Sequence, residues 1–150
     1  MDKKQILQEK ITGKEYGIDC YIDTISNNII DIFIKNKINM RAGETDKAVS
    51  IHNVDITNLV KKLLTESGMI GPVDIDVLEQ DGKYYILEVN PRFGGGYPLA
   101  YECGCNFPRY VLNNIKGKIN NPRILPYENG VVMMKHDRIL VIRGENNGTK

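Results

Sequence analysis

Acidic and amide side chains at alternate positions on two neighbouring segments are the groups in this sequence best suited to chemistry. Asp74 and Asp76 alternate with three apolar residues, and Glu88 and Asn90 alternate with two. Because alternate side chains of a β-strand lie on one face, each segment predicts a polar face and an apolar face. Carboxylate and amide oxygens suit Mg²⁺ or Mn²⁺ better than zinc. The two segments therefore predict a divalent metal site, provided that their polar faces meet.

The register of the hairpin that joins the two segments decides whether the polar faces meet. Its turn signal is Asp81-Gly82. A two-residue loop would pair Asp76 with Leu87 and place a carboxylate on the apolar face, so we expect a three-residue loop that includes Lys83. Facing carboxylates repel one another unless a cation or protons intervene. The expected pairs are Asp76 with Glu88, Asp74 with Asn90, Ile75 with Val89, Val77 with Leu87 and Gln80 with Tyr84.

Arg92 and the glycines that follow it favour a phosphate ligand. Arg92 lies two residues beyond Asn90, so its planar guanidinium can bind a pair of phosphate or carboxylate oxygens over the same face. Gly94-Gly95-Gly96 permits backbone conformations closed to other residues and exposes amides near an anion. The alternative is a solvated hairpin face that ends in a glycine turn, and the residues alone leave it open.

Periodicity elsewhere predicts the elements that position these residues. A helix is expected from Ile56, with Asp55 or Thr57 as its cap and Gly68 at its end. The fold class is α+β, an antiparallel β-sheet of hairpins with two or three helices packed on one face. The other expected elements are a hairpin over 16–39, a polar loop over 40–53 that lines a site, strands over 72–78 and 84–89, helices over 98–103 and 108–115, and a last hairpin joining 131–134 to 139–142.

The composition is that of one ordinary domain. With 150 residues, 41% hydrophobic and 26% charged, the chain is expected to fold as a single domain over 1–150 without a disulfide or metal as a staple. A net charge of +1 gives no general attraction to nucleic acid or anionic membranes. No signal peptide and no apolar run of membrane-spanning length is evident, so we expect a cytoplasmic protein.

The cysteines and histidines are not expected to carry the chemistry. Cys20, Cys103 and Cys105 form no Cys-x-x-Cys motif, so reduced thiols are expected, and a redox or zinc role for the last two is the less favoured interpretation. His52 and His136 have no partners at metal-ligand spacing.

The longest of these motifs resembles a known family. The segment 86–100, which reads ILEVNPRFGGGYPLA, closely resembles the metal and phosphate segment of the ATP-grasp superfamily, particularly its carbamoyl-phosphate-synthetase-like and carboxylate-amine ligase branch. The segment 8–19 resembles the adenine-binding connector of that family, and 71–76 resembles its second metal-ligand strand. Arg41 with Gly43-Glu44 resembles its substrate-side loop.

The resemblance implies a role for each matching residue. Glu88 and Asn90 would bind the Mg²⁺ (or Mn²⁺) that bridges the terminal phosphates of ATP, with Asp76 as the companion ligand. Arg92 would act catalytically by stabilising charge on the transferring phosphoryl group or acyl phosphate. The nucleotide contacts and the second catalytic arginine, on the substrate side, would be Glu9, Lys10 and Ile11 at the adenine, Glu15 at the ribose, and Arg41.

The implied chemistry is attack of a small-molecule carboxylate on the γ-phosphate of ATP, followed by displacement of phosphate by an amine or another nucleophile such as a thiol. The matched segments belong to the carboxy-terminal half of the family's ATP-binding domain, and its amino-terminal lobe and lid have no counterpart in the sequence. We therefore expect a half-site that is inactive alone and partners with the missing lobe or with a second copy. The alternative is a non-catalytic nucleotide-binding or assembly module.

Overall fold

Nine elements make up a sheet and its flanking helices. The computed structural model describes residues 7, 9–123 and 126–142. Within them the elements are β1 (Lys14–Ile22), β2 (Ile29–Arg41), β3 (Glu44–Ile51), α1 (Val54–Ser67), β4 (Gly71–Gln80), β5 (Lys83–Asn90), α2 (Tyr97–Glu102), α3 (Phe107–Ile115) and β6 (Val132–Met134). The six strands form one sheet in the order β5-β4-β1-β2-β3-β6, and every neighbouring pair is antiparallel. The predicted α+β class is confirmed.

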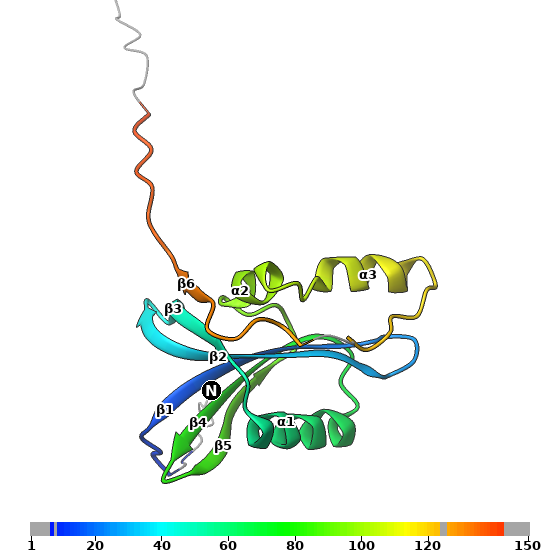
Figure 1. The fold of residues 1–150 in the computed structure, drawn as a ribbon, viewed down its shortest axis with the longest axis horizontal. Coiled ribbons are helices and arrows are strands. Elements are labelled where there is room, and N and C mark those ends of the chain that lie inside the picture. The colour runs from blue at the N-terminus through cyan, green and yellow to red at the C-terminus, as the bar shows by residue number, and fades with distance from the viewer. Residues whose placement is uncertain (1–6, 8, 124–125, 143–150) are drawn as a thin grey trace, which may run out of the picture.

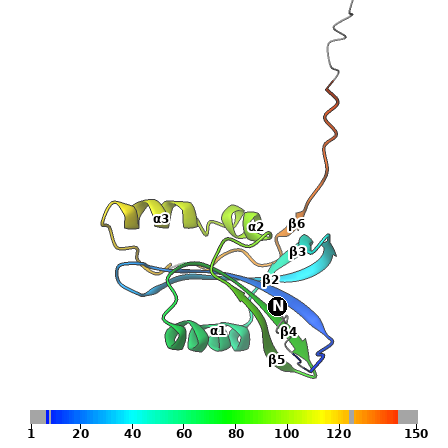
Figure 2. The ribbon, with the colours of Figure 1, turned by 180° about the vertical axis from the view of Figure 1, so that it is seen from behind.

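The helices cover both faces of the sheet, which corrects the expectation that they pack on one. Figures 1 and 2 show α1 on one face and α2 with α3 on the other. The reason is that the central strands β1 and β2 together carry buried apolar side chains on both faces. Ile18 and Ile34 pack toward α1, whereas Tyr21 and Phe33 belong to the cluster that includes Phe107 of α3. A sheet with apolar residues on both faces needs a cover on each.

Helix α1 begins two residues earlier than predicted. The Asn53 side chain, rather than Asp55 or Thr57, accepts a hydrogen bond from the Ile56 amide at 3.0 Å and caps the helix. Gly68 ends it as expected, with a left-handed φ of 66°. The apolar side of α1 lies on the sheet through Ile56, Val60 and Leu64, which are all buried.

The expected polar loop over 40–53 is wrong, because most of it is strand β3. Ala42 and Gly43 have φ values of 52° and 81° and form a tight turn, after which β3 pairs back onto β2. The sequence does not predict this strand, because its buried side chains are small or polar, such as Ala48 and Ser50, and do not alternate as apolar and polar residues. Ser50 accepts a hydrogen bond from the Val131 amide at 2.9 Å through its hydroxyl, so the segment after α3 completes its burial.

The last predicted hairpin also differs. Strand β6 pairs with the open edge of β3, Lys47 opposite Met134, instead of with residues 139–142. An edge strand offers a row of free amides and carbonyls, and β6 satisfies part of that row. Residues 139–142 belong to no strand of the described chain. None of the helices in the described residues combines the length and apolar character that crossing a bilayer requires.

The turn between β1 and β2 is held to the end of α3 by the carboxylate of Asp23, which is fully buried. Its Oδ1 accepts hydrogen bonds from the amides of Ile25 and Ser26 at 3.0 and 2.8 Å. Its Oδ2 accepts from the Asn114 side chain at 2.7 Å and from the amide and side chain of Asn120 at 2.8 and 2.9 Å. Burial alone would raise the pKa of Asp23, but these donors outweigh it and lower the pKa below its ordinary value.

Asp23→Asn is expected to lower the free energy of unfolding by about 3 kcal/mol at pH 7. Donors contact both carboxylate oxygens of Asp23, whereas the asparagine amide has only one oxygen that can accept them. The contribution of a carboxylate with a lowered pKa is complete above its unfolded value near pH 4 and is lost as the pH falls through the folded value. Urea unfolding at pH 7 and pH 3 tests this. The difference from wild type should shrink at pH 3. A constant difference, or an equal loss in the exposed control Glu102→Gln, would contradict it.

Candidate functional site

The β4–β5 hairpin brings the predicted metal ligands together. Asp76 lies opposite Glu88 and Asp74 lies opposite Asn90, as predicted. The predicted apolar pair, Ile75 opposite Val89, is also present. These polar residues come from adjacent strands on the face that α2 and α3 only partly cover. The condition that the polar faces must meet is therefore fulfilled.

The hairpin reaches this register by a different route from the predicted one. Its loop has two residues, Asp81 and Gly82, with φ values of 53° and 74°, so Gln80 pairs with Lys83 and not with Tyr84. A β-bulge between Asp76 and Val77 then restores the phase, because Val77 pairs with Ile86 and Leu87 becomes the extra residue. The predicted three-residue loop and the pairing of Val77 with Leu87 are wrong. One bulged residue shifts the register as one more loop residue would have done.

The bulge also decides on which face of the sheet each side chain of β5 lies. Tyr84 and Ile86 pack against the core under α1, and so does Val89 beyond the bulge. Without the extra residue, Ile86 and Glu88 would share one face. The bulge thus keeps the apolar residues buried and turns the carboxylate of Glu88 to the other face.

A cavity of about 220 Å³ lies over the polar pairs. The predicted ligands Asp76, Glu88 and Asn90 line it together with Arg92, and the turn after β2 and the glycine segment close its sides. In the described part of the chain, no group of three or more His, Cys, Asp or Glu side chains stands close enough to hold a metal by itself. The predicted ligands in this cavity are two facing carboxylates and an amide, so a metal held by them would need further oxygens from a ligand or water.

Lys37 is a site residue that sequence reasoning missed. Its ammonium lies 2.6 Å from Oε1 of Glu15 and 2.7 Å from Oδ1 of Asp76, and only 6% of its side chain is exposed. Burial would lower the pKa of Lys37, but the hydrogen bonds to the two carboxylates raise it above its ordinary value. The predicted ribose residue and the predicted metal ligand are therefore joined through one lysine. The available signal was Lys35-Asn36-Lys37, with two lysines on one face of a strand whose first six residues are apolar except for Asp31.

Lys37 on β2 reaches Asp76 on β4 by passing over β1, and Gly17 of β1 leaves space for it. Gly17 lies between Lys35 on β2 and Asp76 on β4, directly opposite both. A Cβ at this position would be 2.9 Å from Cε of Lys35 and 3.1 Å from Cε of Lys37. The missing side chain lets the lysine stems run over β1 toward the acidic residues of β4.

A second lysine neutralises the deeper part of the same face. Lys35 forms an ion pair with Asp19, and their side chains are 1% and 2% exposed. Burial raises the pKa of nearby Asp74 to about 6, while the Lys35 charge opposes the rise. Arg92 is 3.6 Å from Asp74 Oδ2 and donates a hydrogen bond to the carbonyl of Phe93 at 3.0 Å, and 60% of its side chain is exposed.

The residues expected at the adenine lie in a separate and larger pocket. Glu9, Lys10 and Ile11 line a cavity of about 740 Å³ together with side chains of β5, including Tyr85 and Leu87. This pocket is beside the bulge, so β5 contributes Leu87 to it and Glu88 to the metal cavity. The two cavities are placed next to each other along one strand.

Comparison with known proteins gives this geometry a family. Residues 1–138 match the family model described as ATP-grasp in the biosynthetic pathway with Ter operon. The chain belongs to the ATP-grasp family. Proteins of this family generally bind ATP with Mg²⁺, and the family points to an ATP-dependent ligase.

Individual related proteins share modest sequence identity with this chain. The uncharacterized protein MJ0776 of Methanocaldococcus jannaschii is 31% identical over 121 residues, which are 79% of this chain and 30% of that protein. The chain thus spans about a third of the length of this relative.

Parts of this chain align with parts of three solved structures. L-amino acid ligase from Bacillus licheniformis has a TM-score of 0.49 at 23% identity, covering 70% of this chain and 30% of that one. Rhizobium etli pyruvate carboxylase has a TM-score of 0.46 at 20% identity over 57% and 9% of the two chains. N5-carboxyaminoimidazole synthetase from Staphylococcus aureus has a TM-score of 0.43 at 17% identity over 57% and 25%. Scores below 0.5 do not establish a shared fold, so the family assignment rests on the family match.

Arg41 does not line the metal cavity of this ATP-grasp chain. Its guanidinium pairs with Asp137 through both terminal nitrogens and lies 3.2 Å from Asp46 Oδ1 through Nε. Glu44, on the other side of the same turn, does line the cavity and pairs with Lys135 at 2.9 Å. Of the segment expected on the substrate side, the structure brings Glu44 to the cavity and places Arg41 outside it, in a small separate pocket with Asp46 and Lys135.

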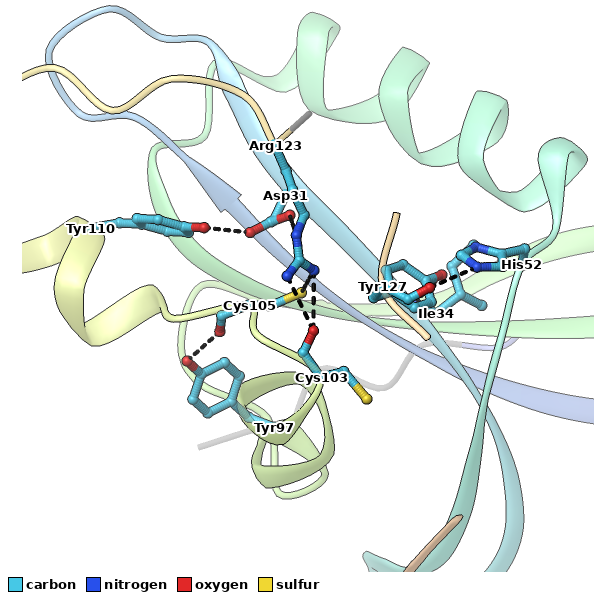
Figure 3. A network of polar contacts seen from close by, with 9 residues as sticks. All are labelled: Asp31, Ile34, His52, Tyr97, Cys103, Cys105, Tyr110, Arg123 and Tyr127. Atoms are coloured by element: carbon cyan, nitrogen blue, oxygen red, sulfur yellow. Dashed lines mark hydrogen bonds and ion pairs between the residues drawn. The ribbon is translucent and has the colours of Figure 1, made fainter. Parts of the chain in front are cut away.

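The thiols of this ATP-grasp chain serve packing. Figure 3 shows Arg123 donating to the carbonyl of Cys103 and contacting Sγ of Cys105 at 3.3 Å. Burial raises the pKa of both thiols above the ordinary value, which disfavours the reactive thiolate. His52 stacks on Tyr127 with ring centroids 4.4 Å apart. Cys103, Cys105 and His52 thus take part in packing contacts of the fold.

The glycine segment packs against the charged face instead of forming an open loop. A Cβ on Gly94 would lie 2.3 Å from Oδ1 of Asp74, and one on Gly96 would lie 2.4 Å from Cε of Lys35. A Cβ on Gly95 would meet only Glu44, at 3.5 Å, an ordinary contact. Two of the three glycines therefore allow the backbone to close on buried charged groups.

Gly94→Ala is expected to lower the free energy of unfolding by about 2 kcal/mol, because the new methyl group forces the short, buried Asp74 side chain to move. Gly95→Ala, the matched control in the same segment, should stay within about 0.5 kcal/mol of wild type. Urea denaturation of the three proteins measures both. Equal effects of the two substitutions would show that the segment is not packed as described.

Proposed function

We propose that this chain provides the Mg-ATP half-site of an ATP-dependent ligase that joins a carboxylate to an amine or a thiol through an acyl phosphate. The observation that carries the proposal is the pairing of Asp76 with Glu88 and of Asp74 with Asn90 across the hairpin, beneath Arg92. Family membership supports the nucleotide, and the facing carboxylates support the metal.

Asp76, Glu88 and Asn90 would hold the Mg²⁺. The donor set fits, because Mg²⁺ is bound in nucleotide sites by one or two carboxylates and completes its octahedron with phosphate oxygens and water. The two carboxylates among the proposed ligands, Asp76 and Glu88, match that requirement. When bound, the ion would neutralise charge on the terminal phosphates of ATP.

Arg92 would stabilise the transferring phosphoryl group. Its guanidinium has a long contact to Asp74 and donates a hydrogen bond to the carbonyl of Phe93 at 3.0 Å, but 60% of the side chain is exposed, so it can turn over the cavity. A substrate carboxylate oxygen would attack the γ-phosphorus, and the bond from that phosphorus to the leaving ADP oxygen would break. The nucleophile would then attack the acyl carbon, release inorganic phosphate and lose its proton. Positioning and charge stabilisation dominate such chemistry.

The nucleotide and substrate contacts follow from the two cavities. Glu9, Lys10 and Ile11 would bind the adenine in the larger pocket, where apolar side chains of β5 offer a surface for a planar base. Glu15 would contact the ribose between the two cavities. Arg41 would bind the substrate carboxylate, because a guanidinium can bind both oxygens of a carboxylate, as that of Arg41 does with Asp137 through two nitrogens.

We also propose that residues 1–150 correspond to the carboxy-terminal part of an ATP-grasp domain. A partner lobe would then enclose the nucleotide from the other side, and full turnover would require that lobe. This agrees with the small share of MJ0776 that the chain spans.

A non-catalytic assembly module is the second candidate, and the outer side of α3 favours it. Leu112 and Ile115 of α3 and Ile119 just after it are 55%, 75% and 55% exposed. Contiguous exposed apolar residues mark interaction surfaces. A second copy of the chain, or the missing lobe, would cover them.

Titration of Mg-ATP by calorimetry tests the half-site. The chain is expected to bind ATP only with Mg²⁺, and Glu88→Gln, which keeps the shape but removes one ligand charge, should weaken binding at least about tenfold. Glu66→Gln, an exposed carboxylate on α1, is the control and should bind as wild type does. Equal ATP affinity in the Glu88 and Glu66 variants would contradict the proposed metal ligand.

Light scattering at increasing protein concentration tests the assembly surface. The chain is expected to self-associate, and Ile115→Lys, which places a charge between the exposed Leu112 and Ile119 at the end of α3, should keep it monomeric. Glu66→Lys on α1 adds a similar charge change elsewhere and should not. A wild-type chain that is monomeric at the highest concentrations rules out this surface as a self-association site.

A further inference from the structure

The guanidinium of Arg41 contacts two carboxylates, and these differ in burial. Its Nε lies 3.2 Å from Oδ1 of Asp46, and its two terminal nitrogens bind both oxygens of Asp137. The Asp46 side chain is 10% exposed, whereas that of Asp137 is 75% exposed. One partner of the arginine is therefore part of the protein interior, and the other is a carboxylate at the surface.

Asp46 keeps the guanidinium in place. Its buried Oδ1 accepts no hydrogen bond from the described residues, and Arg41 is the cation beside it. Its Oδ2 accepts a hydrogen bond from the Asn39 side chain at 3.1 Å, which fixes the carboxylate. If Arg41 moved away, a buried charge would be left without its counter-ion, which is strongly unfavourable. Arg41 therefore stays in position when its outer partner changes.

Asp137 is held much more weakly. Every residue from 136 to 142 is exposed, and the chain beyond β6 projects away from the sheet (Figure 1). Among the described residues, the contact with Arg41 is the only hydrogen-bonded or ion-paired contact of this segment. Exposed ion pairs add little stability, because water and salt ions compete for both groups. Another carboxylate can compete with Asp137 for Arg41 in the same way.

The charges next to this contact balance without Asp137. A pocket of about 50 Å³ is lined by two cations, two carboxylates and a hydroxyl, from Arg41, Lys135, Glu44, Asp46 and Thr45. Each of the two carboxylates is paired with one of the two cations. The further charged groups are Arg92, whose charge acts on Glu44, and His136, which acts on Asp137 when it is protonated. A carboxylate that replaces Asp137 therefore leaves the balance of charge unchanged.

We propose that Arg41, held by Asp46, is a carboxylate-binding site for which Asp137 is a built-in competitor, so that the substrate carboxylate must displace Asp137. The inference rests on the carboxylate substrate of the proposed function and adds how its site is regulated. The ligand class is a molecule with a free carboxylate, because the guanidinium binds both oxygens of such a group and the small pocket admits it. Displacement releases the segment 136–142, in which residues 139–142 are exposed and apolar.

Nuclear magnetic resonance of the full chain, titrated with acetate at an ionic strength kept constant with chloride, tests the proposal. Acetate is expected to shift the amide signals of the β2–β3 turn and to lower the heteronuclear Overhauser effect of the Leu140 amide as the segment is released. Asp137→Asn, which removes the competitor, should bind acetate at least about threefold more tightly. Glu66→Gln removes the same charge from α1 and should bind acetate as wild type does. Arg41→Lys, which keeps the charge but cannot bind both oxygens with two nitrogens, should bind it at least about threefold more weakly.

Equal acetate affinity in wild type and Asp137→Asn would show that Asp137 does not compete, and this overturns the inference. A Leu140 signal that acetate leaves unchanged overturns it too, because the segment is then not released. The same holds if acetate shifts no signal of the turn in any of the proteins, since Arg41 is then no carboxylate site.

Titration of the same proteins with Mg-ATP separates this inference from the function on which it rests. If Glu88→Gln weakens Mg-ATP binding but Asp137→Asn leaves acetate affinity unchanged, the nucleotide site stands and the role of Asp137 is overturned. If acetate displaces Asp137 but none of the proteins binds Mg-ATP, the competition at Arg41 stands and the proposed half-site fails.

Discussion

The neutralisation of one acidic sheet face is the constraint on which the rest of the site depends. Carboxylates from β1, β4 and β5 project from the same side of three adjacent strands, where their mutual repulsion would oppose folding. Lys35 and Lys37 of β2 counter them by reaching across a strand that carries glycine at the crossing. The glycine segment then closes on the inner pair, so the same charges stabilise the sheet and shape the cavity above it.

One half of this face forms a hydrophobic core, and the other half forms the polar cavity. Tyr21 and Phe33 lie under α2 and α3 and form a conventional aromatic core. The charged half lies beyond the helices, next to β5 and the β2–β3 turn, and forms the cavity. A single sheet thus supports a hydrophobic core and a polar site side by side, and the covering helices end where the charged residues begin.

Sequence reasoning reached the ligand pairs because alternation along β4 and β5 leaves one register that keeps carboxylates away from the core. It failed where local patterns carry no signal. A bulge residue such as Leu87 looks like any strand residue, and β3 buries small and polar side chains that resemble a loop. Lys37 was missed because a lysine is assumed to face water unless its partners, which are distant in sequence, are known. The helices were located well, but their division between the two faces depends on long-range packing.

The bulge in β5 has a consequence for the length of the hairpin. A two-residue loop with a bulge and a three-residue loop without one yield the same facing pairs, Asp76 with Glu88 and Asp74 with Asn90. An insertion at the turn that is matched by a deletion at Leu87 would therefore preserve the metal-binding geometry while changing the side chain offered to the neighbouring adenine-sized pocket. The lining of that pocket and the facing of the polar pairs can in this way vary independently, although Leu87 and Glu88 are adjacent in the chain.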